Sequence, residues 1–248
     1  MDLVVPAACA GCGRARTALC TRCGAALFGR VPRRVRPVPQ PPGLPVVYAA
    51  APYRDEVRAV LLAHKERGAL GLAAPLGRAL EGAVRAVPGP KVAAGGEGAW
   101  FLVPVPSARR SVRARGHDAA RRIAFAAAGR IRRCGVPVRV VAALRQRRTV
   151  ADQSRLTSRE RRANLAGALE VARAAVPLLR GVPRVVLVDD LVTTGASLAE
   201  AARAVRTVGV GGVTAAVVAA APGSFGSAEA PAPRQEDRAT GSGGSGTG

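Results

Sequence analysis

Two adjacent acids followed by a turn of small residues are the part of this sequence best suited to chemistry. Asp189 and Asp190 come directly after the apolar run 185–188 and precede the turn 193–197. A short β-branched run of this kind is typical of a parallel strand buried on both faces. Because acids are unfavourable inside such a strand, we expect them to mark its carboxyl end, the edge at which open α/β sheets bind ligands.

The turn after the acids has the composition of an anion cradle. Apolar residues recur at helical spacing behind it, so we predict a helix whose free N–H groups and dipole favour a phosphate. The glycine allows close approach of the backbone, and the neighbouring hydroxyls add donors, while the acids hold sugar hydroxyls or a magnesium ion bound to them. In the competing interpretation, the acids only end a strand and the turn only begins a helix. The predicted phosphate-binding residues are Thr193, Thr194, Gly195, Ala196 and Ser197.

Four cysteines near the N-terminus form two Cys-x-x-Cys-Gly knuckles, Cys9 with Cys12 and Cys20 with Cys23. Two such knuckles can place four thiolates around one metal ion, and Zn²⁺ is the usual occupant. A disulfide framework and a redox pair are the alternatives. No secretory signal precedes the cysteines and reducing cytosol disfavours disulfides, so we expect a structural zinc ribbon whose folding depends on the metal.

Composition limits the class of protein. With 248 residues, of which 48% are hydrophobic, the chain can bury the core of one medium domain with appendages. Its apolar runs are shorter than a membrane span, so we expect a cytoplasmic protein without membrane insertion. The net charge of +22 favours polyanionic partners. Codon bias is the alternative, because Lys65 and Lys91 are the only lysines and the other basic residues are almost all arginines.

The chain is predicted to divide into four parts. Residues 1–29 form the zinc ribbon, 30–45 a proline-rich linker without regular structure, 46–222 the main domain, and 223–248 a disordered tail. In the main domain, strand-like runs alternate with helical periodicity, which predicts an α/β fold with an open, mostly parallel sheet flanked by helices. The predicted strands are 46–51, 100–106, 138–144, 168–171, 185–188 and 213–220, and the predicted helices are 55–63, 119–133 and 70–87, the last interrupted near Pro75.

Two basic segments are candidates for contacts with phosphate groups. Residues 107–116 are predicted to form a loop after a strand, in which Ser107 and Arg109 can meet a diphosphate. Residues 145–162 are too highly charged to form core, and are either a solvated loop with a surface helix or a mobile flap that closes on a bound polyanion. In the second case, Gln153 is a polar contact of the ligand.

The segment 184–197 resembles the phosphoribosyl diphosphate (PRPP) signature of type I phosphoribosyltransferases. In that family the two acids meet the ribose hydroxyls and the following turn wraps the 5′-phosphate. Across nearly all of 2–221, the chain is also similar to the ComF-type phosphoribosyltransferase-like proteins, which are associated with DNA uptake in bacteria. The shared features are the cysteine ribbon, Tyr53, Gln153 and the segments 61–68, 103–106, 115–116 and 162–168.

The chain departs from the ComF-type pattern at one place. Where that family shows Arg-Gly-Phe-Asn-Gln, this sequence follows the Arg-Gly pair at 115–116 with His117, Asp118 and Ala119. His117 is either a general acid or base or, as is more common, a histidine at the start of a helix. Lys65 lies in a segment shared with the family, and is either a PRPP contact or a solvated charge at a helix end.

The resemblance implies a type I phosphoribosyltransferase fold with a small N-terminal zinc ribbon. It also implies an enzyme that uses PRPP and Mg²⁺ to transfer phosphoribosyl to a base or a similar nitrogen acceptor, with Asp189 and Asp190 as catalytic residues. Two other functions stay open: a non-enzymatic PRPP-binding protein that acts on single-stranded DNA in competence, and a PRPP-sensing regulator with a protein partner, such as a competence protein. The expected PRPP contacts outside the turn are Lys65, Ser107, Arg109 and Gln153.

Overall fold

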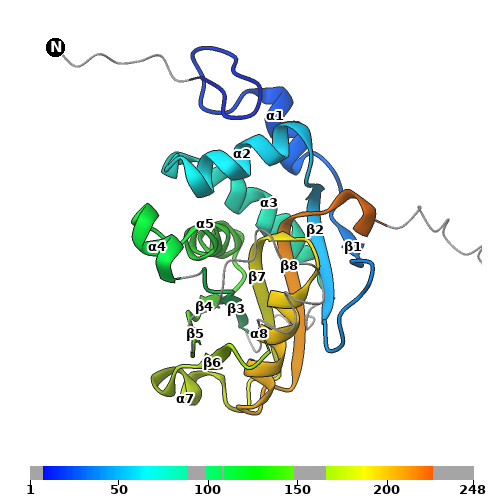
Figure 1. Cartoon of the computed structure of the whole chain (residues 1–248), viewed down its shortest axis with the longest axis vertical. Helices are drawn as coiled ribbons and strands as arrows, with labels where there is room; N and C mark the ends of the chain where they lie inside the picture. The colour runs from blue at the N-terminus through cyan, green and yellow to red at the C-terminus, as the bar shows by residue number, and fades with distance from the viewer. Residues whose placement is uncertain (1–7, 89–98, 108, 148–165, 226–248) are drawn as a thin grey trace, which may run out of the picture.

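The computed structural model describes residues 8–88, 99–107, 109–147 and 166–225, with the backbone alone for 109–111. Among these residues, six strands form one sheet in the order β1-β2-β8-β7-β3-β4 (Figure 1). Neighbouring strands are parallel except β1 and β2, which are antiparallel, so the predicted mostly parallel sheet is confirmed. The strands are β1 (Arg33–Val35), β2 (Val46–Pro52), β3 (Trp100–Pro104), β4 (Val138–Val140), β7 (Arg184–Val192) and β8 (Gly212–Ala220).

Helices cover both faces of the sheet. Val186 and Val188 of β7 belong to one apolar cluster, whereas Val185 and Leu187 belong to another. Because successive side chains of a strand point to opposite faces, the two clusters lie on opposite sides of the sheet, which is the middle of three layers. The first cluster includes α1 (Thr21–Phe28), α2 (Asp55–Glu66), α3 (Ala73–Ala86) and α5 (Ala119–Arg133), and the second includes α7 (Val176–Leu179) and α8 (Ala196–Arg206).

The central strand β7 is longer than the sequence predicts. Residues 185–188 form a buried parallel strand, as predicted, but β7 continues through both acids to Val192. Its pairing with β8 reaches Ala220, whereas its pairing with β3 ends at Val188. The expectation that the acids lie beyond the strand is therefore wrong. The backbone of the acids stays in the strand because β8 continues to pair with β7 after the pairing with β3 has ended.

The predicted strand 138–144 is split into two strands. β4 ends at Val140, and β5 (Leu144–Gln146) pairs antiparallel with β6 (Leu169–Val171) in a separate two-stranded sheet. Between them, the Val141 amide still donates to the Leu102 carbonyl of β3 at 2.9 Å, while the Ala143 amide donates to the Val141 carbonyl at 2.7 Å. This local turn directs the chain out of the main sheet.

Two segments predicted to be irregular contain regular structure. Within 30–45, β1 pairs with the edge of β2 and buries Val35. Prolines near this strand are tolerated because it lies at the edge of the sheet. Within 107–116, the predicted basic loop contains the helix α4 (Arg109–Arg115).

The other predicted strands and helices are present, with two corrections. The tail predicted from 223 begins too early, because the 3₁₀ turn η3 (Pro222–Ser224) is ordered and buries Ser224. Pro75 does not interrupt a helix, because it lies in the first turn of α3, where its missing N–H has no intrahelical acceptor. A 3₁₀ turn, η1 (Leu70–Leu72), precedes α3. Of the predicted tail, residues 226–248 lie outside the described residues. Among the described residues, no helix combines the length and the apolarity that a membrane span requires.

Candidate functional site

The two acids of β7 have different surroundings. Because they occupy successive positions of the strand, they point to opposite faces of the sheet. Asp190 is buried on the side of α2, where its Oδ2 lies 2.8 Å from Lys65 Nζ. Asp189 is half-buried, and its Oδ1 accepts a hydrogen bond from the Asp190 amide at 2.8 Å. The sequence does not distinguish the two acids, but within the described part of the structure only Asp190 forms an ion pair.

Lys65 brings the positive charge from the last turn of α2. Burial opposes its ionisation, but the nearby carboxylates of Asp190 and Asp189 raise its pKa above the usual lysine value. The pKa of the Asp189 carboxyl is raised well above its usual range, first by burial and then by repulsion from Asp190, with Lys65 acting in the opposite direction. A carboxylate that is costly to ionise here gains from any ligand that brings a cation or hydroxyl donors.

The turn after β7 has the backbone that a close approach to a ligand requires. Gly195 adopts the left-handed conformation, with φ of +76°. A Cβ atom at this position would lie 3.0 Å from Leu44 Cδ1, so a larger residue would also press on the segment before β2. Ala196 begins α8, as predicted, and its amide lies 3.5 Å from Thr194 Oγ1. Thr193 is exposed and Ser197 is half-buried, so these hydroxyls lie at the N-terminal end of α8, where anions are favoured.

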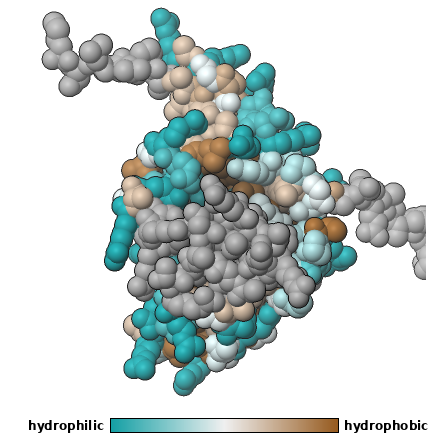
Figure 2. Space-filling model, viewed as in Figure 1, coloured by the Kyte–Doolittle hydropathy of each residue, from teal (hydrophilic) through white to brown (hydrophobic). Residues whose placement is uncertain are grey.

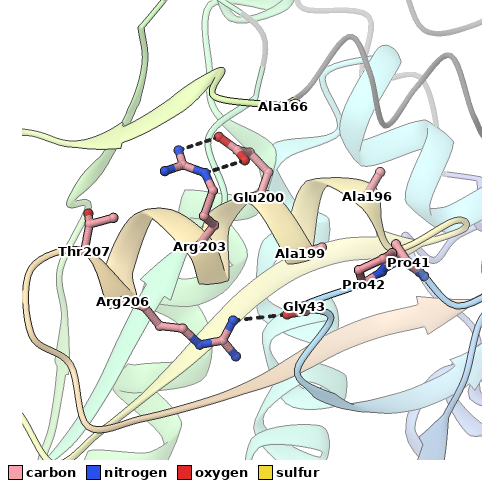
Figure 3. A pocket seen from close by; sticks show the side chains of 10 residues that line it. All are labelled: Pro41, Pro42, Gly43, Ala166, Ala196, Ala199, Glu200, Arg203, Arg206 and Thr207. Carbon is pink, nitrogen blue, oxygen red and sulfur yellow. Dashed lines mark hydrogen bonds and ion pairs between the residues drawn. The ribbon is translucent and has the colours of Figure 1, made fainter.

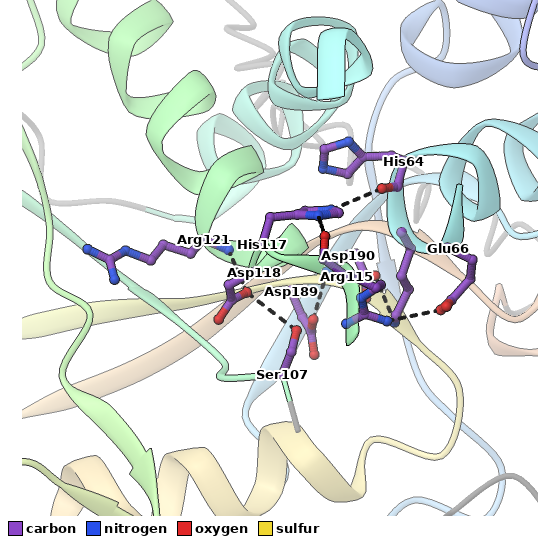
Figure 4. A network of polar contacts seen from close by, with 10 residues as sticks. His64, Glu66, Ser107, Arg115, His117, Asp118, Arg121, Asp189 and Asp190 are labelled. Atoms are coloured by element: carbon purple, nitrogen blue, oxygen red, sulfur yellow. Dashed lines mark hydrogen bonds and ion pairs between the residues drawn. The ribbon is translucent and has the colours of Figure 1, made fainter. Parts of the chain in front are cut away.

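A polar network lies next to the acids (Figure 4). Ser107 Oγ donates to Asp118 Oδ1 at 3.4 Å, and the same carboxylate oxygen caps α5 by accepting from the Arg121 amide at 3.2 Å. The structure thus brings Ser107 close to the start of α5. Asp118 was not predicted to be a functional residue, although an Asp immediately before helical periodicity is a recognisable capping signal.

Two of the predicted PRPP contacts cannot be placed by their side chains. Arg109 begins α4, but its side chain lies outside the described part of the structure. Gln153 lies outside the described residues altogether, as does most of the basic segment 145–162. Their roles stay predictions.

The four N-terminal cysteines converge on one point. The sulfur atoms of Cys9, Cys12, Cys20 and Cys23 all lie within 4.8 Å of one another. The Sγ atoms of Cys12 and Cys20 are 3.6 Å apart. Zn–S bonds of ~2.3 Å in a tetrahedron place sulfurs ~3.8 Å apart, so the cluster fits a zinc ion.

The electrostatics of the cysteine cluster also suit a cation. Burial opposes ionisation of Cys9, but hydrogen bonds from backbone amides, led by that of Cys20, lower its pKa to about 6. The Cys20 amide lies 3.3 Å from Cys9 Sγ. Burial and the neighbouring cysteines raise the pKa of Cys23, which is the expected penalty for a fourth thiolate without a metal. A metal ion is therefore the partner that lets all four sulfurs ionise together.

The cysteine cluster differs in two respects from the independent zinc ribbon that the sequence predicts. Its second knuckle is not a strand turn, because Cys20 is the N-cap of α1 and Cys23 lies in the first turn of that helix. It also packs on the main domain, where Arg22 forms an ion pair of 2.8 Å with Glu56 of α2. The helix that carries Lys65 toward the acids thus contacts the cysteine cluster at its other end.

A hollow of about 690 Å³ lies beside α8, and neither of the two acids lines it (Figure 3). Within it, Arg206 donates to the Gly43 carbonyl at 3.2 Å. Buried Glu200 accepts from the Leu169 amide at 3.0 Å and binds Arg203 through two bonds of 2.8 Å. These contacts fasten β6 and the segment before β2 to the helix that begins at the predicted phosphate turn. The lining residues are Pro41, Pro42, Gly43, Ala166, Ala196, Ala199, Glu200, Arg203, Arg206 and Thr207.

The arrangement of a parallel strand, paired acids, a glycine turn and a helix start can be compared with known families. Residues 119–236 match the phosphoribosyl transferase domain family. The match includes β7, both acids, the turn and α8, and with the sheet order it confirms the predicted fold class. A phosphoribosyltransferase domain supports phosphoribosyl transfer at a coarse level and implies PRPP as the substrate. Lys65 and the cysteine cluster lie before the matched range. No curated protein matches this chain.

Proposed function

We propose that the protein is a phosphoribosyltransferase that binds PRPP with Mg²⁺ and transfers the phosphoribosyl group to a base or a similar nitrogen acceptor. The observation that carries this proposal is the position of Asp189 and Asp190 in β7, directly before the glycine turn of a phosphoribosyltransferase domain. Mg²⁺ ions, when bound with PRPP, neutralise the diphosphate leaving group. The acceptor class rests on the resemblance to the type I family.

The proposed binding roles follow from the surroundings of each residue. Half-buried Asp189 accepts hydrogen bonds from the ribose hydroxyls, because no described residue forms an ion pair with it as Lys65 does with Asp190. Asp190 holds Lys65 at the edge of the same site. The turn 193–197 and the first amides of α8 bind the 5′-phosphate. Ser107 and Arg109 lie where the chain leaves β3, and we assign them, with Gln153, to the diphosphate.

The proposed reaction needs no protein nucleophile. The bond between the anomeric carbon of ribose and diphosphate breaks, and a nitrogen atom of the acceptor donates the electron pair of the new bond to the same carbon. Positive charge develops on the ribose ring as the leaving group departs. The carboxylates at 189 and 190 stabilise this charge through space, and the fixed turn holds the sugar in place by its phosphate.

The domain organisation is part of the proposal. We assign 1–29 to a cysteine cluster that binds structural Zn²⁺, and 46–222 to the catalytic domain, with 30–45 between them. The convergence of the four sulfurs, which all lie within 4.8 Å of one another, supports the zinc assignment. The four-cysteine cluster, the segments quoted above and the matched domain support a kinship with ComF-type proteins. We place the protein in the cytoplasm, where thiols stay reduced and available to the metal.

The alternative is a PRPP-binding protein that acts on single-stranded DNA in competence. The net charge of +22 favours this alternative. On the visible face, however, hydrophilic residues of the described part are spread widely rather than gathered in one patch (Figure 2). A DNA affinity that falls steeply with salt, at a slope that indicates several phosphate contacts, would support the alternative.

The experiment that tests the proposal is calorimetric titration of PRPP and Mg²⁺ into the zinc-loaded protein. We expect binding by the wild type and loss of binding in Asp189→Ala/Asp190→Ala. The control is Glu170→Ala, because Glu170 lies on β6 in the separate two-stranded sheet. Consumption of PRPP with release of diphosphate only when a base is added would then identify the enzyme. If the wild type does not bind PRPP, the proposal is wrong.

A further inference from the structure

The two residues on either side of Lys65 are held by a single short segment, Arg115 to His117, which binds the backbone of His64 and the side chain of Glu66. We propose that Arg115 and His117 are positioning residues that fix Lys65 against Asp190. The functional meaning of this inference rests on the proposed PRPP site, since Lys65 sets the charge next to the acids. The geometric part stands on contacts between α2 and the segment that precedes α5 (Figure 4).

His117 holds the residue before Lys65. Its Nε2 lies 3.1 Å from the backbone carbonyl oxygen of His64, and its Nδ1 lies 3.1 Å from the Arg115 carbonyl oxygen. A ring protonated on Nε2 donates to His64, and a ring protonated on both nitrogens donates to both carbonyls. His117 is only 7% exposed and His64 is fully buried, with their ring centres 5.6 Å apart. The contact is therefore shielded from water.

Arg115 holds the residue after Lys65. Its guanidinium Nη1 lies 3.1 Å from Glu66 Oε1. The Arg115 side chain is 11% exposed, whereas that of Glu66 is 52% exposed, so the cation is the anchored partner. Residues 64 and 66 are thus each bound by one member of the same turn, in which Gly116 has φ of +73°.

The position of Lys65 makes this support necessary. The last four carbonyls of a helix lack intrahelical donors, and α2 ends at Glu66, so the His64 carbonyl is one of them. The Ala63 carbonyl accepts from both the Arg67 and Ala69 amides, but His64 needs another donor, which His117 provides. A last turn without that donor frays. The long Lys65 side chain would then lose its fixed distance to Asp190.

This contact is also where the sequence leaves the ComF-type pattern. That pattern has a phenylalanine at the position of His117, and a phenyl ring cannot donate to a carbonyl. In this chain, residue 117 therefore makes a hydrogen bond that a phenylalanine could not make. The substitution His117→Phe keeps a planar aromatic ring and removes both ring nitrogens, which makes it the sharpest test.

The test uses the two lysines of the chain as spectroscopic reporters. Full-length, zinc-loaded protein with isotopically labelled lysine gives side-chain signals from Lys65 and Lys91 alone, and Lys65→Arg assigns them. In the wild type, we expect the Lys65 ammonium to titrate above the usual lysine range, because of the two carboxylates. In His117→Phe, we expect its signal to shift and its titration to move toward that of a free lysine, with Lys91 unchanged. His117→Gln, which retains an N–H donor, should restore most of the wild-type behaviour.

Glu66→Gln and Arg115→Met test the second contact, the ion pair between Arg115 and Glu66. Glu66→Gln should shift the Lys65 signal in the same direction as His117→Phe, and the Glu66 side chain is exposed enough for the substitution to leave folding intact. Arg115→Met also removes a cation that lowers the pKa of Lys65, so for this variant the readout is a broadened Lys65 signal rather than the titration. If His117→Phe does not give a cooperative thermal transition, the result with Glu66→Gln decides. A Lys65 signal and titration unchanged in folded His117→Phe and in Glu66→Gln would overturn the inference.

Binding of PRPP provides the functional readout. If the proposed function is correct, His117→Phe should weaken PRPP binding by about five- to tenfold, the effect of one lost hydrogen bond, and His117→Gln should recover it. The lysine spectra are recorded without PRPP. A wild type that does not bind PRPP, but in which His117→Phe moves the Lys65 signal, would reject the proposed function and keep the positioning role. If the protein binds PRPP but its lysine spectra are unchanged in His117→Phe, the positioning role is rejected and the proposed function is kept.

Discussion

Lys65 Nζ lies 2.8 Å from Asp190 Oδ2, although the two residues are far apart in the chain and come from different layers of the fold. Among the residues that the structure describes, one of the two adjacent acids has a close cation and the other, Asp189, forms no ion pair. One acid therefore stabilises the protein while the other is available to a ligand. This division of roles leads to the first two predictions.

Asp190→Asn should destabilise the protein, because it leaves Lys65 partly buried beside the acids without its partner. The Lys65 side chain is 35% exposed, so we expect a loss of only about 1 kcal/mol in the free energy of unfolding. Urea denaturation of Asp190→Asn, Lys65→Gln and the double variant measures the coupling. Additive losses would show that the ion pair contributes nothing.

Asp189→Asn should stabilise the protein at neutral pH and abolish PRPP binding. Burial and Asp190 raise the pKa of folded Asp189 above that of the unfolded chain, which is about 4. Stability is then highest below the unfolded pKa and falls as the pH rises through the folded pKa, because the folded state resists ionisation. The gain from Asp189→Asn should therefore be present at pH 7 and vanish below about pH 4. An equal gain at both pH values would contradict this origin.

Removal of zinc should unfold the N-terminal cluster and weaken the support of α2. A chelator or the substitution Cys23→Ser should lower the midpoint of thermal unfolding, since the metal contributes to folding. Metal analysis should give one zinc per chain in the wild type and a loss in the variant. Cys134→Ser is the matched control, because Cys134 is exposed and lies outside the cluster. Sensitivity to reducing agents in place of chelators would indicate disulfides.

Gly195→Ala should cost roughly 1–2 kcal/mol of stability from the left-handed backbone alone. The new Cβ would also approach Leu44 to 3.0 Å and disturb the predicted phosphate turn, so PRPP binding should weaken. Gly195→Ala/Leu44→Ala removes the steric contact and leaves the backbone strain. Comparison of their unfolding free energies separates the two effects. Gly181→Ala, which has a similar φ but open space around it, measures strain alone.

Glu200→Gln should destabilise the protein by about 1–3 kcal/mol, because a buried carboxylate binds Arg203 and the Leu169 amide. Burial opposes ionisation of Glu200, but these donors lower its pKa below the usual value. The stabilisation is present above the unfolded pKa and is lost as the pH falls through the folded pKa. The cost of Glu200→Gln should therefore be greater at pH 7 than in acid. Glu170→Gln, in a more exposed ion pair, should cost less than about 1 kcal/mol.

Several features of the site could be predicted from the sequence because they depend on neighbouring residues. The apolar run 185–188 and the small turn before α8 are contiguous, so strand, turn and helix follow from local pattern. The spacing of the cysteines within each knuckle is likewise visible in the sequence, and the four sulfurs converge as predicted. The alternation of strands and helices along the sequence was sufficient to predict a mostly parallel sheet.

Other features depended on contacts between distant segments. Pairing with β8 keeps the acids within β7, and pairing with β2 makes part of a proline-rich segment a strand, β1. Neither partner is near in sequence, so local pattern cannot report the pairing. The α4 helix in 109–115 also escaped prediction, because its arginine-rich sequence lacks the apolar periodicity that indicates a helix.

The sequence by itself determined which residues are available for chemistry: two acids, a glycine turn and four cysteines in fixed spacing. The tertiary structure alone decided how the acids differ, because alternation along β7 sends them to opposite faces and α2 offers a lysine to only one of them. It also decided that His117 and Arg115 hold the residues beside that lysine. Charge compensation depends on distances across the fold, and those distances are set by packing rather than by order along the chain.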